Sequence, residues 1–297
     1  MIEGIFIEGL IYGLMVLGVF ITFRVLDFPD LTVDGSFPLG AAIMAACITA
    51  GINPWFALLI AFSGGLAAGA VTALIHTKLK VPNLLAGILT MTMLYSVNIR
   101  ILGNKANLQL LTQETILTQV TGIVKNFIPE EYASLIFFIF IIFAIKFILN
   151  IFFRTDLGLT LGAMGNNEHM VVIQGVNPDY LKLIGVGLAN GLVALSGAFM
   201  AQYQGFADVN LGQGIIVSGL ASVMIGEFIL SSNKISIITL RAVLGSIVFR
   251  GIMYLGRYYG YKIHLTPNDL KLITGLMIIA ALMITKFKKV KFKNSRT

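Results

Sequence analysis

Long apolar segments separated by short polar connections run along almost the whole sequence. A helix needs about 20 apolar residues to cross the ~30 Å hydrocarbon layer of a bilayer. A further apolar segment, 38–51, would form only about 21 Å of helix. The pattern predicts an all-α, polytopic membrane protein with about nine apolar helices, one of them short or broken. The eight segments of full length lie near residues 4–23, 53–76, 82–102, 133–152, 179–201, 214–230, 234–256 and 269–286.

The composition indicates that lipid is the main solvent of the chain. Hydrophobic residues make up 57% of the 297 residues and charged residues 12%, whereas a soluble domain has roughly 25% charged residues. The net charge of +7 has a local origin, because six positive charges lie in the final stretch KFKKVKFKNSRT. We therefore predict a transmembrane permease domain over 1–286, a basic cytoplasmic tail over 287–297, and no interaction with nucleic acid.

The distribution of Lys and Arg predicts which connections face the cytoplasm. With the tail inside and the helices alternating, connections that carry Arg24, Lys78, Lys80 and Arg154 lie on the cytoplasmic side, as the positive-inside rule requires. The N-terminus is then external, as is the connection 103–132. Apolar residues in that connection have the spacing of an amphipathic helix at the membrane interface. They are Ile116, Val120, Ile123, Val124 and Phe127.

Motifs for catalysis or metal binding are missing from the sequence. It has no G-x-x-x-x-G-K-[ST] phosphate loop, no H-E-x-x-H and no G-x-S-x-G. The single Cys47 excludes an intramolecular disulfide, and His76, His169 and His264 do not have the spacing of metal ligands. We therefore expect a transport subunit and not an enzyme, with no metal and no cofactor of its own.

The cytoplasmic connection 153–178 has the sequence of a turn, a short helix and a second turn. Gly158 and Gly162 permit bending, and an amphipathic stretch covers 161–172. Gly175 and the following Asn-Pro pair then end this stretch and begin the next helix. A short helix across this face would give a surface on which another protein can push. An ordinary connection between helices explains the same residues.

Several motifs carry a resemblance to a known family. The run RTDLGLTLGAMGNNEHMVVIQGVNP has an Arg-Thr-x-x-Gly start and an Ala-x-Gly-x-Asn core. In these motifs it resembles the permease family of bacterial ABC importers for branched-chain amino acids and ribose-type sugars, most of all its tryptophan/tyrosine-type or uncharacterised members. LTVDGSFPLGAAIMA and the hairpin that contains Gly226-Glu227 are also similar, although Glu227 stands where the family usually has Gly. Gln174, Met170 and Val171 depart from the family's smaller residues.

The resemblance implies a type II-like ABC importer permease, a multi-pass protein of the bacterial inner membrane. Two copies, or this chain and a different permease, would line the path of a small polar solute, expected to be an amino acid. Cytoplasmic ATP-binding subunits would bind the ATP, and an extracytoplasmic substrate-binding lipoprotein would deliver the solute. The residues implied to couple those subunits to the path are Gly158, Ala163, Gly165, Asn166, Asn167, Glu168 and Gly175.

Two other transport functions remain open on the sequence. The resembling family includes permeases for sugars, so an ABC importer for a sugar or nucleoside is one alternative. A self-sufficient secondary transporter is the other, since such transporters also use broken helices near the membrane midplane.

The stretch RVLDFPDLTVDGSFPLG places three aspartates between two apolar segments. Because the apolar segment that follows is too short to span, residues 25–37 are predicted to re-enter the membrane as irregular backbone that lines a cavity. Asp34 and Ser36 would then cap a half-helix begun by Pro38, while Asp30 would face the path. The alternative keeps all three aspartates in cytoplasmic water.

Two polar residues of the segment 82–102 complete the candidate path. Asn83 also suits a helix start, and Thr90 also suits a hydrogen bond to a carbonyl of its own helix. The candidate path residues are therefore Asp30, Asp34, Ser36, Asn83 and Thr90.

The remaining polar residues at membrane depth have structural explanations beside functional ones. Glu227, Arg241 and Arg250 can extend to lipid headgroups on long stems, or can serve a site. Asn98 is expected at the membrane interface. Asn190, among small residues, is expected to pack helices together, and the Gly/Ala-rich stretch GGLAAGA at 64–70 is likewise expected to give close helix packing.

Overall fold

The structure, a computed structural model, describes residues 2–124, 129–230 and 234–262, with a few isolated positions after them. Seven of its helical segments are long and apolar enough to cross a membrane, which confirms the seven full-length spans predicted over these ranges. The predicted span 269–286 and the tail 287–297 lie outside the continuously described residues. The long helices are α1 (Ile2–Phe20), α3 (Pro54–Leu79), α4 (Asn83–Ile101), α6 (Glu130–Phe152), α9 (Pro178–Gln204), α10 (Ile215–Ile229) and α11 (Ile235–Lys262).

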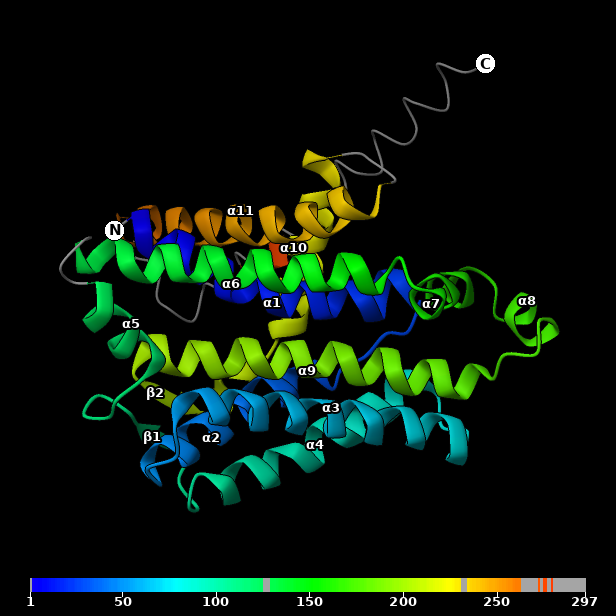
Figure 1. Cartoon of the computed structure of the whole chain (residues 1–297), viewed down its shortest axis with the longest axis horizontal. Coiled ribbons are helices and arrows are strands. Elements are labelled where there is room, and N and C mark those ends of the chain that lie inside the picture. The colour runs from blue at the N-terminus through cyan, green and yellow to red at the C-terminus, as the bar shows by residue number, and fades with distance from the viewer. Residues whose placement is uncertain are drawn as a thin grey trace.

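Short elements gather at the two ends of this bundle, as Figure 1 shows. One end holds α5 (Ile116–Val124) and the strands β1 (Asn107–Gln109) and β2 (Phe206–Asp208), which pair antiparallel. The other end holds α7 (Asp156–Asn166) and α8 (Glu168–Ile173). The connections 103–132 and 153–178 were predicted on opposite sides of the membrane, and this arrangement agrees with that topology.

The chain breaks between its first two helices. α1 continues into a π-helical turn, η1 (Ile21–Val25), and residues 26–32 are not helical. α2 (Val33–Thr49) then runs for 17 residues, too few for a full crossing. The predicted irregular backbone is thus confirmed over 26–32, and the predicted short helix is present.

The start of this short helix differs from the prediction that Pro38 begins it. α2 begins at Val33, and Asp34, Ser36 and Pro38 all lie within it. Pro38 has no N–H to donate to the Asp34 carbonyl, yet the helix continues through it, and Gly212 packs its backbone against that carbonyl. The prediction that Asp34 and Ser36 cap a helix starting at Pro38 is wrong.

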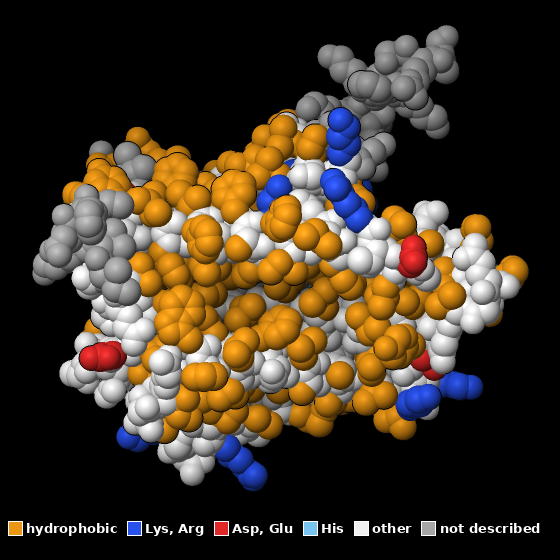
Figure 2. All heavy atoms as spheres, viewed as in Figure 1, with side chains coloured by type: hydrophobic (Ala, Val, Ile, Leu, Met, Phe, Trp, Pro, Cys, Tyr) orange, Lys and Arg blue, Asp and Glu red, His pale blue; other side chains and the backbone are white. Residues whose placement is uncertain are grey.

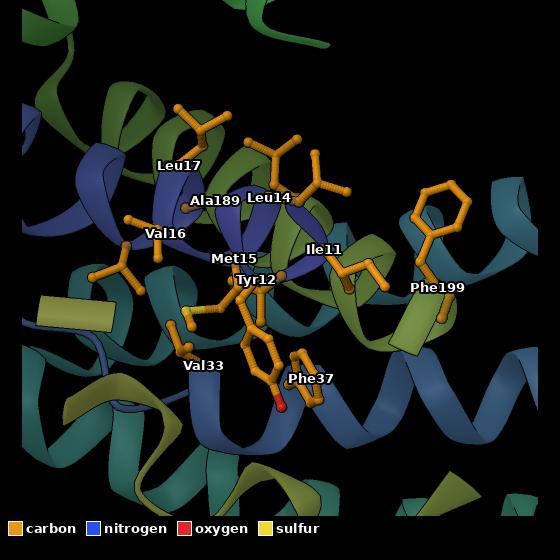
Figure 3. Packing of buried hydrophobic residues seen from close by; sticks show 14 of the residues in the cluster. Ile11, Tyr12, Leu14, Met15, Val16, Leu17, Val33, Phe37, Ala189 and Phe199 are labelled. Carbon is orange, nitrogen blue, oxygen red and sulfur yellow. The ribbon is translucent and has the colours of Figure 1, made fainter. Parts of the chain in front are cut away.

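α9 is the central helix and packs against α1, α2 and α3. Small residues let the backbones approach closely: a side chain at Gly65 or Gly69 of α3 would overlap carbonyl oxygens of Asn190 and Val186 in α9. Figure 3 shows the buried side chains where α1 meets α2 and α9, among them Tyr12, whose ring stacks on Phe37 with centroids 5.5 Å apart. The close packing predicted from the Gly/Ala-rich run at 64–70 is confirmed.

The outer surface of the bundle is apolar. Figure 2 shows hydrophobic side chains over the face that carries α6, α9 and α3, with most charged side chains at its edges. Phe140 and Phe147 of α6 are 70% and 65% exposed. Such exposure fits contact with lipid tails and would be a liability in water.

The predicted amphipathic helix in the connection after α4 is present as α5. Ile116 at its start is fully buried, and its N–H donates to Gln202 Oε1 of α9 at 2.8 Å. α5 also packs against α6. Phe127, the last residue of the predicted pattern, lies outside the described residues.

The ionisable residues at membrane depth pair with one another. Glu227 of α10 forms ion pairs with Arg24 at 2.7 Å and with Arg241 of α11 at 3.2 Å. Arg250 lies 3.7 Å from Glu8 and places its guanidinium 3.3 Å above the Tyr12 ring. Pairing inside the protein therefore explains these residues, and extension to headgroups is not required.

The close approach of α3 and α9 can be tested by adding one methyl group to a glycine between them. Gly69→Ala is expected to destabilise the protein by about 1–3 kcal/mol, since the added methyl overlaps the Val186 carbonyl and pushes the helices apart. Thermal unfolding of the purified chain in detergent measures the effect. Gly162→Ala is the matched control, because open space surrounds Gly162 in α7. It should be neutral or stabilising by up to ~1 kcal/mol. Equal unfolding temperatures for the two variants would contradict the packing.

Candidate functional site

A buried hydrogen-bond network holds the break between α1 and α2. Asp30 is fully buried, its Oδ1 accepts from the Thr32 N–H at 2.9 Å, and its Oδ2 accepts from Asn190 Nδ2 at 2.6 Å. Ser36 Oγ donates to Asn190 Oδ1 at 2.7 Å. One amide of α9 therefore binds both the break and the first turns of α2. The alternative in which all three aspartates lie in water is wrong for Asp30, whereas Asp27 is exposed.

Two more helices enclose the same break. The hydroxyls of Thr32 and Thr72 of α3 lie 2.7 Å apart. On the side of α4, a side chain at Gly87 would come within 2.7 Å of the Leu31 nitrogen, so only a glycine lets this helix approach. The break is thus packed between α3, α4 and α9, where its polar backbone is shielded from lipid.

Asp34 reaches across to another helix. Its Oδ2 accepts from the Gly214 N–H and its Oδ1 from the Ile216 N–H, each at 2.9 Å. These N–H groups lie at the N-terminus of α10, whose own cap residue, Gly214, has a left-handed φ of 74° and no side chain. Asp34 therefore caps α10 instead of α2, and the N-terminal ends of two helices meet at one carboxylate.

A cavity of about 390 Å³ opens beside Asp34. α2 and α4 form two of its walls, and the turn before α10 forms the third. It is lined by Asp34, Gly35, Pro38, Met91, Thr92, Tyr95, Asn98, Val209, Gln213 and Gly214.

Asn98 is the buried polar residue of this cavity. It is 1% exposed and lies near the end of α4, and its expected place at the membrane interface stays a prediction. Its Nδ2 donates to the Gly35 carbonyl at 3.2 Å, which fixes the orientation of the amide. Its Oδ1 has no hydrogen-bond partner among the described residues.

The candidate path residues divide into three groups. Asp34 lines the cavity, and Asp30 and Ser36 belong to the buried network behind it. Asn83 and Thr90 of α4 are in neither: the Asn83 side chain accepts from the Leu84 N–H at 2.9 Å, and Thr90 donates to the Ala86 carbonyl at 3.0 Å. Their place in the path stays a prediction.

The sequence reasoning missed three residues that the structure brings to this region. Asn190 is the centre of the buried network, and Asn98 and Tyr95 line the cavity. The available signal was an amide inside an apolar helix, because a buried amide needs partners on neighbouring elements. Its partners could not be named from the sequence.

The connection predicted to couple to other subunits folds into two helices instead of one amphipathic stretch. Thr155 caps α7 by accepting from the Gly158 N–H at 3.3 Å, and Asn167 ends α7 and caps α8 through the Met170 N–H, also at 3.3 Å. Gly175 adopts a left-handed φ of 80° at the following turn. The break at Asn167 arises because its side chain competes with the helix for backbone donors.

One side of α7 and α8 packs against the rest of the protein, and the other side is exposed. Gly158 and Gly165 pack their backbones against the carbonyls of Phe152 and Val25. The exposed side combines polar residues with apolar ones, and Glu168 forms a 2.9 Å ion pair with Lys182 of α9. The exposed residues include Ala163, Asn166, Asn167, Glu168, Met170, Val172 and Ile173.

The buried network makes a quantitative prediction. Asn190→Ala leaves Asp30 Oδ2 and Ser36 Oγ without their partner, and each unsatisfied buried group costs about 1–3 kcal/mol. Thermal unfolding in detergent should therefore show a large loss of stability. The double variant Ser36→Ala/Asn190→Ala is the control. It should be less destabilised than the sum of the single variants by roughly 0.5–3 kcal/mol, because they share one hydrogen bond; simple additivity would contradict the network.

Comparison with known proteins identifies the family. Residues 1–282 match the family described as branched-chain amino acid transport system / permease component. The tyrosine transport system permease protein of Clostridioides difficile (strain R20291) is 39% identical over 93% of this chain and 88% of its own length. The uncharacterized protein RP368 of Rickettsia prowazekii (strain Madrid E) is 32% identical over 94% and 95%. The ribose import permease protein RbsC of Escherichia coli (strain K12) is 26% identical over 69% and 62%.

A solved structure has the same fold. PsaBC from Streptococcus pneumoniae in complex with Fab aligns with a TM-score of 0.54 and 13% identity, over 93% of this chain and 89% of that one. The fold, the seven apolar spans and the match over residues 1–282 agree with one another. The chain is therefore a multi-pass membrane protein that belongs to the family of permease components of branched-chain amino acid transport systems.

Proposed function

We propose that this permease is the membrane subunit of an ATP-driven importer for an amino acid. Two copies line the path, cytoplasmic ATP-binding subunits dock on α7 and α8, and an extracytoplasmic lipoprotein delivers the solute. The tyrosine permease of Clostridioides difficile supports an amino acid as the solute. The ribose permeases support a sugar only through lower identity over a shorter part of this chain.

The observation that carries the proposal is the exposed side of α7 and α8. Ile173 is 84% exposed, and Met170 and Val172 are 56% and 50% exposed, beside the polar residues at 166–168. Apolar anchors with a polar surround are typical of a protein-docking surface. A self-sufficient secondary transporter has no need of such a surface.

A continuous line of packed groups leads from that surface to the site. Gly165 of α7 packs against the carbonyl of Val25, the last residue of η1. The neighbouring Leu26 fills the space in front of Gly185 of α9, where Leu161 of α7 also lies. Beyond Leu26 the chain is non-helical through Thr32, and Asp34 in the first turn of α2 then contacts the N-terminus of α10. We infer that a push on α7 moves η1 and the break, and through them the walls of the cavity.

Reconstitution tests the proposal directly. Proteoliposomes that contain the chain with its ATP-binding subunits should accumulate radiolabelled tyrosine when ATP and the substrate-binding lipoprotein are present. Excess unlabelled tyrosine should compete, and excess ribose should not. Uptake by the chain alone along an ion gradient would show a secondary transporter and refute the proposal.

The polar part of the docking surface should govern coupling. Asn167→Ala/Glu168→Ala is expected to leave ATP hydrolysis by the complex within about twofold while it lowers uptake at least tenfold, because the cap of α8 and the Lys182 ion pair are lost. ATPase activity and uptake are measured in the same vesicles. Unchanged uptake in the double variant would remove these residues from the coupling surface.

The apolar part should govern docking itself. Ile173→Asp buries a charge in the proposed interface and should abolish co-purification of the ATP-binding subunits. Leu111→Asp is the matched control, since Leu111 is 79% exposed but lies near β1 and α5 at the other end of the bundle. Equal co-purification of both variants would place docking elsewhere.

A further inference from the structure

Among the described residues, the cavity beside Asp34 presents hydrogen-bond acceptors without a positive side chain to match them. None of the ten described residues that line it is Lys, Arg or His, and Asp34 is the acidic one among them. Asn98 adds an amide oxygen that is buried and has no partner among the described residues. Because a buried acceptor without a donor costs about 1–3 kcal/mol, this wall is incomplete until something donates to it.

The two acceptors lie on adjoining parts of the wall. Asn98 donates to the carbonyl of Gly35, the residue that follows Asp34 in α2. Each oxygen of the Asp34 carboxylate accepts one N–H from α10, and an ionised carboxylate has about four lone-pair positions. Part of its acceptor capacity is therefore still available to a ligand in the cavity.

The remaining walls are mostly apolar. Pro38, Met91, Val209 and the ring of Tyr95 face the same space. The volume of about 390 Å³ is near the lower end of the roughly 300–1,000 Å³ typical of ligand sites, which suits a small solute. A sugar would present a ring of hydroxyls that both donate and accept, and this wall offers it few donors.

We propose that the cavity is a binding site for the primary ammonium group of the transported solute. The ammonium donates to Asp34 and to Asn98 Oδ1, and the apolar part of the solute lies against Met91 and Tyr95. This proposal rests on the proposed importer function, and it names the ammonium group as the part of the solute that the permease itself recognises. An ammonium group has three donors and a positive charge. It can therefore donate to the free acceptor positions of the wall and balance the charge of the Asp34 carboxylate.

The labelling rate of a cysteine placed in the cavity can report which charge the cavity favours. Cys47 is the single cysteine of the chain, and Thr92 lines the cavity with a hydroxyl that donates to the Leu89 carbonyl of its own helix. The full-length variant Cys47→Ser/Thr92→Cys is purified and inserted into lipid nanodiscs. It is labelled with 2-aminoethyl methanethiosulfonate, a primary ammonium, or with 2-sulfonatoethyl methanethiosulfonate, an anion.

The expected result is a rate at least tenfold higher for the ammonium reagent, after correction for each reagent's rate with a free thiol. Tyramine should slow the labelling, whereas ribose and 3-(4-hydroxyphenyl)propionate should not. Asp34→Asn, added to this background, should reduce the preference at least fivefold. Asp208→Asn is the matched control, since Asp208 also caps a short helix, through the Asn210 N–H at 2.7 Å, but does not line the cavity.

Because Asp34→Asn also changes the cap of α10, a second variant tests the site with that cap intact. Asn98→Ala keeps that cap and should weaken protection by tyramine at least fivefold. The proposal is overturned if both reagents react equally, if neither reacts, if the preference survives Asp34→Asn, or if ribose protects as well as tyramine.

The labelling needs no ATP-binding subunit, so it can fail independently of the importer function. Equal labelling rates together with ATP-driven uptake in proteoliposomes would remove only the ammonium site. Selective labelling without ATP-driven uptake would remove the importer function and keep the site.

Discussion

Backbone polar groups that leave a helix inside an apolar protein must find hydrogen-bond partners, and the rest of this structure depends on how one break meets that demand. Residues 26–32 interrupt what would otherwise be continuous helix. Asp30 accepts from the backbone within the break, and Asn190 joins it to the central helix α9. Asp34 then supplies acceptors to the N-terminus of α10. Two carboxylates and one amide thus make an interrupted helix tolerable in lipid.

Satisfying the break also places it where it can transmit a movement. On one side it continues from η1, whose Val25 packs with Leu26 against Gly165 of α7, and on the other it leads into α2, where Asp34 lines the cavity. Intact helices on either side, α3 and α9, approach each other closely through glycines and change shape less easily. The irregular segment therefore connects the surface of α7 with the cavity through a part of the chain that is not helical.

The sequence was sufficient for the features that depend on local composition. Apolar length predicted the seven described spans, and glycine-rich stretches predicted close helix packing. It was insufficient where distant residues decide the outcome. The Asp34 carbonyl, which lacks its helical donor at Pro38, packs against the backbone of the distant Gly212. Glu227 and Arg24 form an ion pair although 203 positions separate them in the sequence. Asn190 donates a hydrogen bond to Asp30, which lies 160 positions before it. No local pattern contains these pairings.

The hydrogen bonds from α10 to Asp34 have a consequence for how the protein is made. The donor at Ile216 lies 182 positions after its acceptor. At the usual rates of bacterial synthesis this separation corresponds to on the order of 10–40 s. During that interval α2 to α9 are completed and become available for insertion after α1, yet the carboxylate that will line the cavity has neither of its α10 donors. The cavity is thus completed late in synthesis, when the chain has passed the turn at Gly214, and a chain that ends before this turn cannot form it.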